Sequence, residues 1–523
     1  MPPLASAAAL DRAAPPSARA DTRLTMLLWS GGDERLTLDA YGRNKYGVPA
    51  CPTPDEIWFS SSTASSISPR GFAAAGRDLD ALLSGDLGRL PLADFFDAVR
   101  TDLLAVCTAP SGARAILTPS GTEAELIVLA LASSRSPRPL LNIVVAPHET
   151  GSGVLLAASG RHFLGSASLG DEVAKGALLA GIESRDIAVE TIDIRDSCGA
   201  PRAAASIDAE AATRVRRALK KNWDVLLHVL DCSKTGLSGV SRSTATALRA
   251  EGAGRVDIVV DACQLRCPPA MIRADLEAGF LVTVTGSKFA GGPPFCGAVL
   301  VPADLAGAVH ASRPPPLGLS AYSAYFDWPD DLRPWVGRRL AAPANLGLGL
   351  RWRAALAELQ AFHAAPRVVT AACFAAFSAH VRAQAKQRPW MSLGPPAPRQ
   401  TDRDETIIPI TLRAADGDWL SPADTAAIHV ALRDGDEKCH LGQPVVLGAQ
   451  TAVRFCASAS MAAGFAERIA SGSAQAAFEP ICGAIDRVFG KLDRVYAQQC
   501  SRDPVMGAQD ETDPWTLRAQ SRP

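Results

Sequence analysis

The sequence has no charge-free apolar run of about 20 residues, the length that a helix needs to cross a bilayer, so we predict no membrane span. It also has no excess of either charge. Its 53 basic residues stand against 54 acidic ones, and this balance does not favour nucleic acid or an anionic membrane as a partner. The first 20 residues lack an uninterrupted apolar core, and we therefore expect no secretory signal and a cytoplasmic protein.

Two kinds of ligand-binding pattern are missing as well. The 12 cysteines are scattered, and the nearest cluster, Cys263 and Cys267, has neither a second pair nor matching histidines behind it. We therefore predict no metal site and interpret the thiols as reduced and buried. The glycine patterns of the Walker and Rossmann phosphate loops are also absent, which counts against a nucleotide-binding enzyme.

The patterns that are present fit a large α/β protein. The 523 residues exceed one ordinary core and predict two or more domains. Between residues 71 and 310, short apolar runs alternate with helix-like stretches, a pattern typical of strands buried on both faces of a mainly parallel sheet. We expect these strands at residues 141–146, 225–230, 256–260, 281–285 and 298–301, and helices at residues 79–106 and 123–133.

The rest of the chain predicts a smaller α+β domain and less regular flanking segments. We expect helices from residue 346 to about 377, strands at 406–412, 445–447 and 452–456, and a final helix at 480–498 whose Pro480 lies in the first turn. The expected layout is a flexible tail (1–22), an N-terminal arm (23–70), the large domain (71–340), the small domain (341–500) and a second tail (501–523). The serine-rich run at 60–66 fits either a linker or a loop that closes over a site.

Two of the expected strands lead into residues that suit one cofactor. Asp261 ends one apolar run, and Lys288 follows another and precedes a glycine-rich turn. Ligands of open α/β sheets gather at the carboxyl ends of the strands. A lysine amine forms a Schiff base with the aldehyde of pyridoxal 5'-phosphate, and a carboxylate keeps the pyridine nitrogen protonated. These residues predict that cofactor, and the hydroxyls of Thr285 and Ser287 could bind its phosphate.

Two upstream segments fit the same cofactor. Ser120, Gly121 and Thr122 open a helix, and the free amides at a helix N-terminus form an anion site that suits the phosphate. His148 lies just past another expected strand, where it can stack on the pyridine ring. Taken singly, the helix start is typical of an ordinary cap and the histidine of a structural residue. The order and spacing of all four motifs together favour pyridoxal phosphate.

These motifs resemble those of the class V aminotransferase group of fold-type I pyridoxal-phosphate enzymes, which includes cysteine desulfurases and selenocysteine lyases. The resemblance covers roughly residues 60–470. The family's Asp-Ala-x-Gln strand end stands here as residues 261–264, and its Ser-Gly-His-Lys stands as residues 285–288. The resemblance implies that Asp261 pairs with the pyridine nitrogen and that Gln264 pairs with the 3-hydroxyl of the ring.

The resemblance includes further matches and some departures. Residues 120–123 match the family's phosphate loop, and His148 matches its stacking histidine. Ser287 stands where the family commonly has a phosphate-binding imidazole, and Asp231 stands where it usually has an asparagine near the ring oxygen. Residues 341–343 lack the family's Gly-Thr pair, whose threonine reaches the phosphate of the neighbouring subunit.

Two residues of the expected small domain also resemble functional positions of the family. Arg454, in the expected strand at 452–456, looks like the family's arginine that clamps the substrate carboxylate. A planar guanidinium suits that role, because it can bind a carboxylate through two hydrogen bonds. The alternative is a surface arginine on a strand. Cys439 lies 15 residues before Arg454, similar to the persulfide-forming cysteine of a desulfurase subgroup. The residues around Cys439 match that loop poorly, and a buried or incidental thiol is the alternative.

The resemblance implies a fold-type I enzyme that forms a homodimer with its sites at the interface. It favours lyase or desulfurase chemistry on a cysteine-like amino acid, with Lys288 as the base or acid at the α-carbon. An aminotransferase or decarboxylase of specialised metabolism is the alternative within this cofactor class. A non-catalytic regulatory protein on the same fold is the alternative of another class, and it predicts the loss of Lys288 or Asp261, which are both present.

Overall fold

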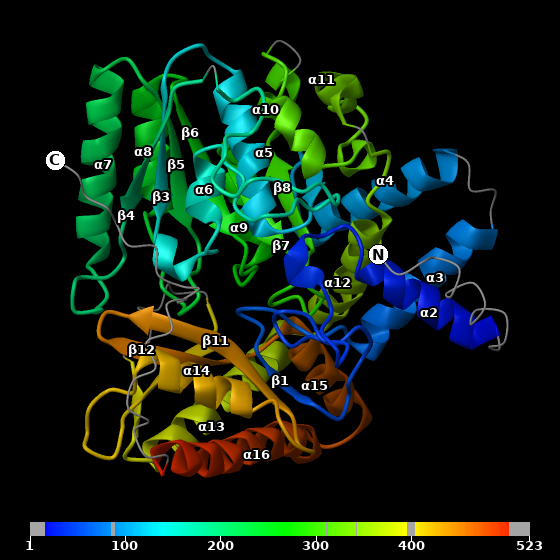
Figure 1. Ribbon diagram of the computed structural model, residues 1–523, viewed down its shortest axis with the longest axis vertical. Coiled ribbons are helices and arrows are strands. Elements are labelled where there is room, and N and C mark those ends of the chain that lie inside the picture. Colours follow the sequence, from blue (N-terminus) through cyan, green and yellow to red (C-terminus); the bar gives the residue numbers. More distant parts are fainter. Residues whose placement is uncertain are drawn as a thin grey trace.

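Two sheets organise the protein. The computed structural model describes residues 16–84, 89–183, 185–309, 312–340, 342–394 and 403–501. The larger sheet has seven strands in the order β2-β8-β7-β6-β5-β3-β4, and the smaller has five in the order β1-β11-β12-β10-β9. In Figure 1 the larger sheet and its helices form the upper part of the molecule, and the smaller sheet with α13, α14 and α16 forms the lower part.

The large sheet is mixed and mostly parallel, as the sequence predicts. Its strands are β2 (Arg114–Thr118), β3 (Leu140–Val145), β4 (Ile187–Ile192), β5 (Asp224–Leu230), β6 (Val256–Ala262), β7 (Leu281–Thr285) and β8 (Gly297–Val301). Strands β3 to β7 are paired in parallel, and β8 is antiparallel to both β7 and β2. All five strands expected from the apolar runs are present. The sequence prediction missed β2 and the partly exposed strand β4.

Helices cover both faces of this sheet. Its strands are therefore buried on both sides, which explains why their sequences are apolar throughout. The helices of this part of the chain are α3 (Pro69–Ser84), α4 (Arg89–Val106), α5 (Gly121–Ser134), α6 (Val154–Ala158), α7 (Ala204–Lys220), α8 (Arg242–Gly252), α9 (Pro269–Glu277), α10 (Ala303–Ala308) and α11 (Arg333–Val336). Leu226 of β5 shares a core cluster with α5, whereas its neighbour Val225 shares one with α7 and α8. The stretch expected as one helix at 79–106 contains parts of two, α3 and α4.

The small sheet combines C-terminal strands with one strand from the N-terminal arm. Its strands are β1 (Ile57–Phe59), β9 (Met391–Leu393), β10 (Ile407–Leu412), β11 (Cys439–Leu447) and β12 (Gln450–Cys456). The accompanying helices are α12 (Leu346–Ala364), α13 (Arg367–Lys386), α14 (Pro422–Ala431), α15 (Ala459–Ser471) and α16 (Ala474–Cys500). The prediction for the last helix was wrong at its start. Ser473 caps α16 by accepting from the amide of Ala476, so Pro480 lies inside the helix rather than in its first turn.

The N-terminal arm is more ordered than expected. Residues 16–22, assigned to a flexible tail, begin helix α2 (Pro16–Leu28), in which Leu24 and Leu28 are buried. Arg351 of α12 is fully buried and donates to the carbonyls of Leu28 and Ser30, which fixes the end of α2. Residues 1–15 and 502–523, which make up most of the two expected tails, lie outside the described residues.

No single helix in the described part of the chain is long and apolar enough to cross a membrane, and only α12 and α13 taken together, bent by 105°, reach the required length and composition.

Candidate active site

The sheet register places the predicted site residues at one edge of the large sheet. Gly297, the first residue of β8, pairs with both Thr118 at the end of β2 and Thr285 at the end of β7. The start of α5 and the turn with Lys288 therefore lie at the same edge. Asp261 pairs with Leu230 and with Thr283, so it belongs to this edge as well. This is the edge where parallel α/β sheets bind ligands.

Lys288 is half-buried in the turn after β7, and no described residue bonds its side-chain amine. Its backbone is held by the serine-rich run. The amide of Ser65 donates to the carbonyl of Ser287 at 3.1 Å, and the Ser65 hydroxyl donates to the carbonyl of Lys288 at 3.0 Å. Residues 60–66 therefore pack directly on the lysine turn, and the structure supports a loop that covers a site rather than a linker.

The carboxylate of Asp261 is half-buried, and its Oδ1 accepts from the amide of Cys263 at 3.0 Å. Glu125 of α5 lies near it. Burial, and then the charge of Asp261, raise the pKa of Glu125 well above 4.5. His228 Nε2 lies 3.5 Å from Glu125 Oε2 and 2.9 Å from Asn142 Oδ1, and burial lowers the pKa of His228 to about 3. Asp261 thus has an acid with a raised pKa near it, and the imidazole that contacts this acid is neutral at neutral pH.

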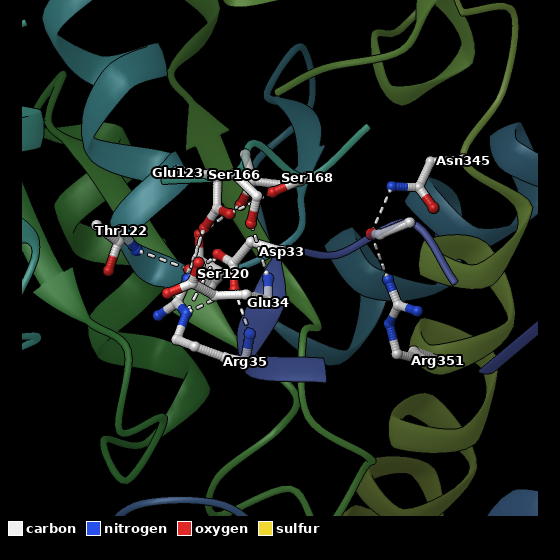
Figure 2. Close-up of polar contacts among 12 residues, drawn as sticks. Asp33, Glu34, Arg35, Ser120, Thr122, Glu123, Ser166, Ser168, Asn345 and Arg351 are labelled. Carbon is white, nitrogen blue, oxygen red and sulfur yellow. Dashed lines mark hydrogen bonds and ion pairs between the residues drawn. The ribbon is translucent and has the colours of Figure 1, made fainter. Parts of the chain in front are cut away.

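The start of α5 is a capped helix whose serine is already bonded. The Ser120 hydroxyl accepts from the amide of Thr122 at 3.1 Å and donates to the carboxylate of Glu123. Figure 2 shows Arg35 of the short helix η1 (Glu34–Leu36) reaching this turn. Its Nη2 lies 3.5 Å from Ser120 Oγ and 2.6 Å from Asp33 Oδ2. Ser120 is therefore a cap in this structure, and any phosphate contact of this turn falls on other groups.

Gly121 lies where the sheet edge leaves no space for a side chain. A Cβ atom there would come within 2.7 Å of Cys263 Sγ and 3.6 Å of Thr285 Cγ2. The Thr285 hydroxyl donates to the carbonyl of Cys263 at 2.6 Å. The hydroxyl hydrogen of Thr285 is therefore used in a bond to the turn after β6. It is not free to make the predicted donation to a phosphate. Thr122 is buried, and Ser287 is half-buried.

Two predicted ring contacts are also engaged within the protein. Gln264 Nε2 donates to the carbonyl of Ser62 at 3.0 Å, so this side chain holds the serine-rich run. Asp231 is fully buried, and its Oδ1 accepts from Arg242 at 2.9 Å and from Arg403. Its Oδ2 has no partner among the described residues. Asp231 thus stands where the family has an asparagine, and Arg242 and Arg403 balance its charge. Its contact with a ring oxygen stays a prediction.

His148 lies on the short helix η2 (Pro147–Glu149) after β3, and its ring is exposed. The helix is fixed by the next residue. The buried carboxylate of Glu149 accepts from Arg195 Nε at 2.5 Å and from the Ser233 hydroxyl at 2.7 Å, and it also accepts from Thr235. The backbone therefore presents His148 rigidly toward open space, and stacking on a ring stays a prediction.

Arg454 is fully buried on β12, so the surface-arginine alternative was wrong. Its guanidinium donates to the carbonyls of Gln443 and Lys234, at 2.9 and 3.1 Å, and to the Thr63 hydroxyl at 2.9 Å. Within the described residues it forms no ion pair with a carboxylate, and burial lowers its pKa to about 10. The charge of Glu149 acts on Arg454, but Glu149 is itself paired with Arg195. A buried cation with so little counter-charge is costly, which fits a site that receives an anion.

Cys439 is the first residue of β11 and is fully buried, with its backbone paired to Ile57 of β1. Burial raises the pKa of its thiol to about 11. A thiol in this state is protonated at neutral pH and is a poor nucleophile. The geometry favours the buried-thiol alternative. All 12 cysteines are unpaired, and most are buried.

Sequence reasoning missed several residues that surround this edge. Arg266 donates to the carbonyl of Ala457 at 3.0 Å and to the Ser61 hydroxyl at 2.9 Å, and its guanidinium lies over the ring of Phe289, next to Lys288. Lys234 lies in the loop after β5, and its carbonyl bonds Arg454. The position of Arg266 two residues after Gln264 was a usable signal. Nothing in the local sequence marked Lys234.

No family model and no curated protein matches the sequence. Solved structures do match the fold. Oryza sativa TDC with PLP shares 12% identity, with 86% of this chain and 84% of that chain covered and a TM-score of 0.51. Catharanthus roseus tryptophan decarboxylase in complex with L-tryptophan shares 12% identity, with 86% and 85% covered and a TM-score of 0.52. At this identity the likeness shows the fold alone. It confirms the predicted fold-type I transferase fold and does not single out the class V group.

Proposed function

We propose that the chain is a pyridoxal-phosphate enzyme that acts on an amino-acid substrate, with Lys288 as the lysine that holds the cofactor. The observation that carries the proposal is the placement of Lys288 and Asp261 on neighbouring strand ends, β7 and β6, both half-buried and with the lysine amine bonded by no described residue. Oryza sativa TDC, solved with PLP, and Catharanthus roseus tryptophan decarboxylase have the same fold.

The residues present fit this cofactor. Asp261 offers a half-buried carboxylate near Glu125, whose pKa burial raises, and this carboxylate suits a protonated pyridine nitrogen. Cys263 fills the position that a Cβ atom of Gly121 would take, so Gly121 can offer a ligand only its backbone amide. The amide of Gly121 and the side chains of Thr122 and Ser287 are the groups left for the phosphate. His148 would stack on the ring. When bound, the cofactor supplies an electron-withdrawing ring that stabilises negative charge at the substrate's α-carbon.

The protein's own residues then divide the remaining tasks. Arg454 binds the substrate carboxylate, because its buried guanidinium has only neutral acceptors in the protein. Lys288 moves the proton at the α-carbon. The serine-rich run shields the lysine turn from water, because Ser65 bonds it and Ser62 bonds Gln264. We also propose, from the family resemblance, a cytoplasmic homodimer.

Among the reaction types, we favour a lyase or aminotransferase that does not relay sulfur through the protein. A persulfide relay needs an accessible thiolate on a loop that can reach the substrate. Cys439 is instead buried in a paired strand, with a pKa raised to about 11 by that burial. Decarboxylation and transamination stay open, as does β-elimination without a protein persulfide.

The test is chemical fixation of the cofactor. Purified protein loaded with pyridoxal phosphate is reduced with borohydride, digested and analysed by mass spectrometry. We expect one modified peptide, with the adduct on Lys288. Lys288→Ala should lose it, and Lys220→Ala, at an exposed position at the end of α7, should keep it. Persistence of the adduct in Lys288→Ala, or its absence from the parent protein, would overturn the proposal.

A further inference from the structure

Lys234 is fixed between two of the proposed functional residues. Its amide donates to the carbonyl of Glu149 at 3.1 Å, in the helix that carries His148. Its carbonyl accepts from Arg454 Nη1 at 3.1 Å. The loop around it is rigid, because the Ser233 hydroxyl accepts from two loop amides and donates to Glu149. The backbone of Lys234 thus links the helix that carries His148, the proposed ring-stacking residue, to Arg454, the proposed carboxylate-binding residue.

The side chain of Lys234 lies in an unbalanced charge environment. It is half-buried, and its amine has no hydrogen-bond partner within the described ranges. The charged groups that act on it are the cations Arg454 and Lys288 and the anion Glu149. Burial, followed by Arg454 and Lys288, lowers the pKa of Lys234 to about 7.

Glu149 is only a partial counter-charge for this lysine. Its carboxylate already accepts from the side chains of Arg195, Ser233 and Thr235. The guanidinium of Arg454 and the amines of Lys234 and Lys288 therefore approach one region, and within the described residues neither Lys234 nor Arg454 forms an ion pair. The α-carboxylate of an amino acid would balance one of these charges. A second anion would be needed to balance Lys234.

We propose that Lys234 is a specificity residue that binds the side-chain carboxylate of an acidic amino-acid substrate while Arg454 binds its α-carboxylate, an inference that rests on the proposed function. The inference names the substrate class as dicarboxylic amino acids. A carboxylate beside Lys234 favours the protonated amine, so binding of such a substrate takes up protons from solution near neutral pH. A neutral side chain gains neither the ion pair nor the proton.

The experiment measures binding to the cofactor-loaded enzyme by titration calorimetry near pH 7.5. The probes are L-aspartate and L-glutamate, with L-asparagine and L-glutamine as neutral isosteres, in two buffers of different ionisation enthalpy. We expect the acids to bind about tenfold or more tightly than the amides, with proton uptake for the acids alone. Lys234→Gln should lose the preference and the uptake, and Lys234→Arg should keep the preference without the uptake.

The outcomes separate this inference from the proposed function. If the borohydride adduct on Lys288 does not form, the proposed function fails. If the adduct forms but the parent enzyme binds acids no better than amides, or binds neither, the inference alone fails. It also fails if Lys234→Gln, with normal cofactor content and circular dichroism, keeps the preference and the proton uptake. Because the parent enzyme's own preference is decisive, the test does not depend on the variant folding.

Discussion

Replacing Glu125 by glutamine tests the electrostatics near Asp261. Glu125 is buried on α5, and burial, with Asp261 as the second cause, raises its pKa well above 4.5. His228, at 3.5 Å, cannot compensate as a cation, because burial lowers its pKa to about 3. The folded protein therefore keeps a proton on Glu125 at pH values where the unfolded chain has lost it.

The sign and size of the effect follow from this difference in bound protons. An acid whose folded pKa is raised contributes most to stability below its unfolded pKa, and that contribution falls as the pH rises toward the folded value. One proton corresponds to about 1.4 kcal/mol for each pH unit. Glutamine has no such proton to lose. The free energy of unfolding of Glu125→Gln should therefore gain on that of the parent as the pH rises from about 5.5 to about 7.5, by at most about 1.4 kcal/mol for each pH unit.

The assay is urea unfolding of both proteins across this pH range, followed by circular dichroism. Glu251→Gln is the control. Glu251 is exposed on α8 and bonded to Arg216, which lowers its pKa, so the difference between this variant and the parent should not change with pH above 5.5. A constant difference for Glu125→Gln as well would mean that Glu125 is ionised in the folded protein. That result would refute the neutral surroundings that we assign to Asp261.

Two further substitutions test the roles of small-domain residues. Arg454→Ala should weaken amino-acid binding by about 2–5 kcal/mol in calorimetric titration while the adduct on Lys288 still forms. The same substitution should lower the melting temperature, because the carbonyls of Gln443 and Lys234 lose their donor. An unchanged affinity for the amino acid would exclude Arg454 as the residue that binds the substrate carboxylate. Cys439→Ala should leave turnover of an accepted amino acid intact, as measured by product release, whereas complete loss of turnover with a normal adduct would revive a sulfur relay through this thiol.

The sequence located the strands of the large sheet because those strands are apolar on both faces. The run at 281–285 coincides with β7, and Lys288 and Asp261 were placed at the right edge because strand ends mark it. Strand β1 was missed because three residues carry too little pattern and its partner, β11, lies far along the chain. Helix α2 was missed because composition alone suggested a loose tail, whereas burial against other helices stabilises it.

The same reasoning explains which site residues could not be predicted. The bond from Arg454 to Thr63 joins positions 391 apart in the sequence, and no local pattern encodes such a contact. Ser120 was read correctly as a helix cap among the alternatives, but its bond to Glu123 and its approach to Arg35 depend on how the arm folds back (Figure 2). Tertiary packing decides which side chains form such hydrogen bonds within the protein. Motif matching therefore names candidate residues without showing which of their polar groups remain available to a ligand.

The charges of the described residues give the site a direction. At one end, Asp261 lies near Glu125, whose pKa burial raises, and Glu125 in turn contacts His228, whose pKa burial lowers to about 3. Toward the other, Arg454 and the amines of Lys234 and Lys288 lie close together with no carboxylate of their own to pair with in the described chain, since Glu149 already pairs with Arg195. A ligand with a positive ring nitrogen at one end and carboxylates at the other matches both ends at once. Reversing such a ligand would place like charges together, so the protein's own field selects one orientation before any contact with a ring is made.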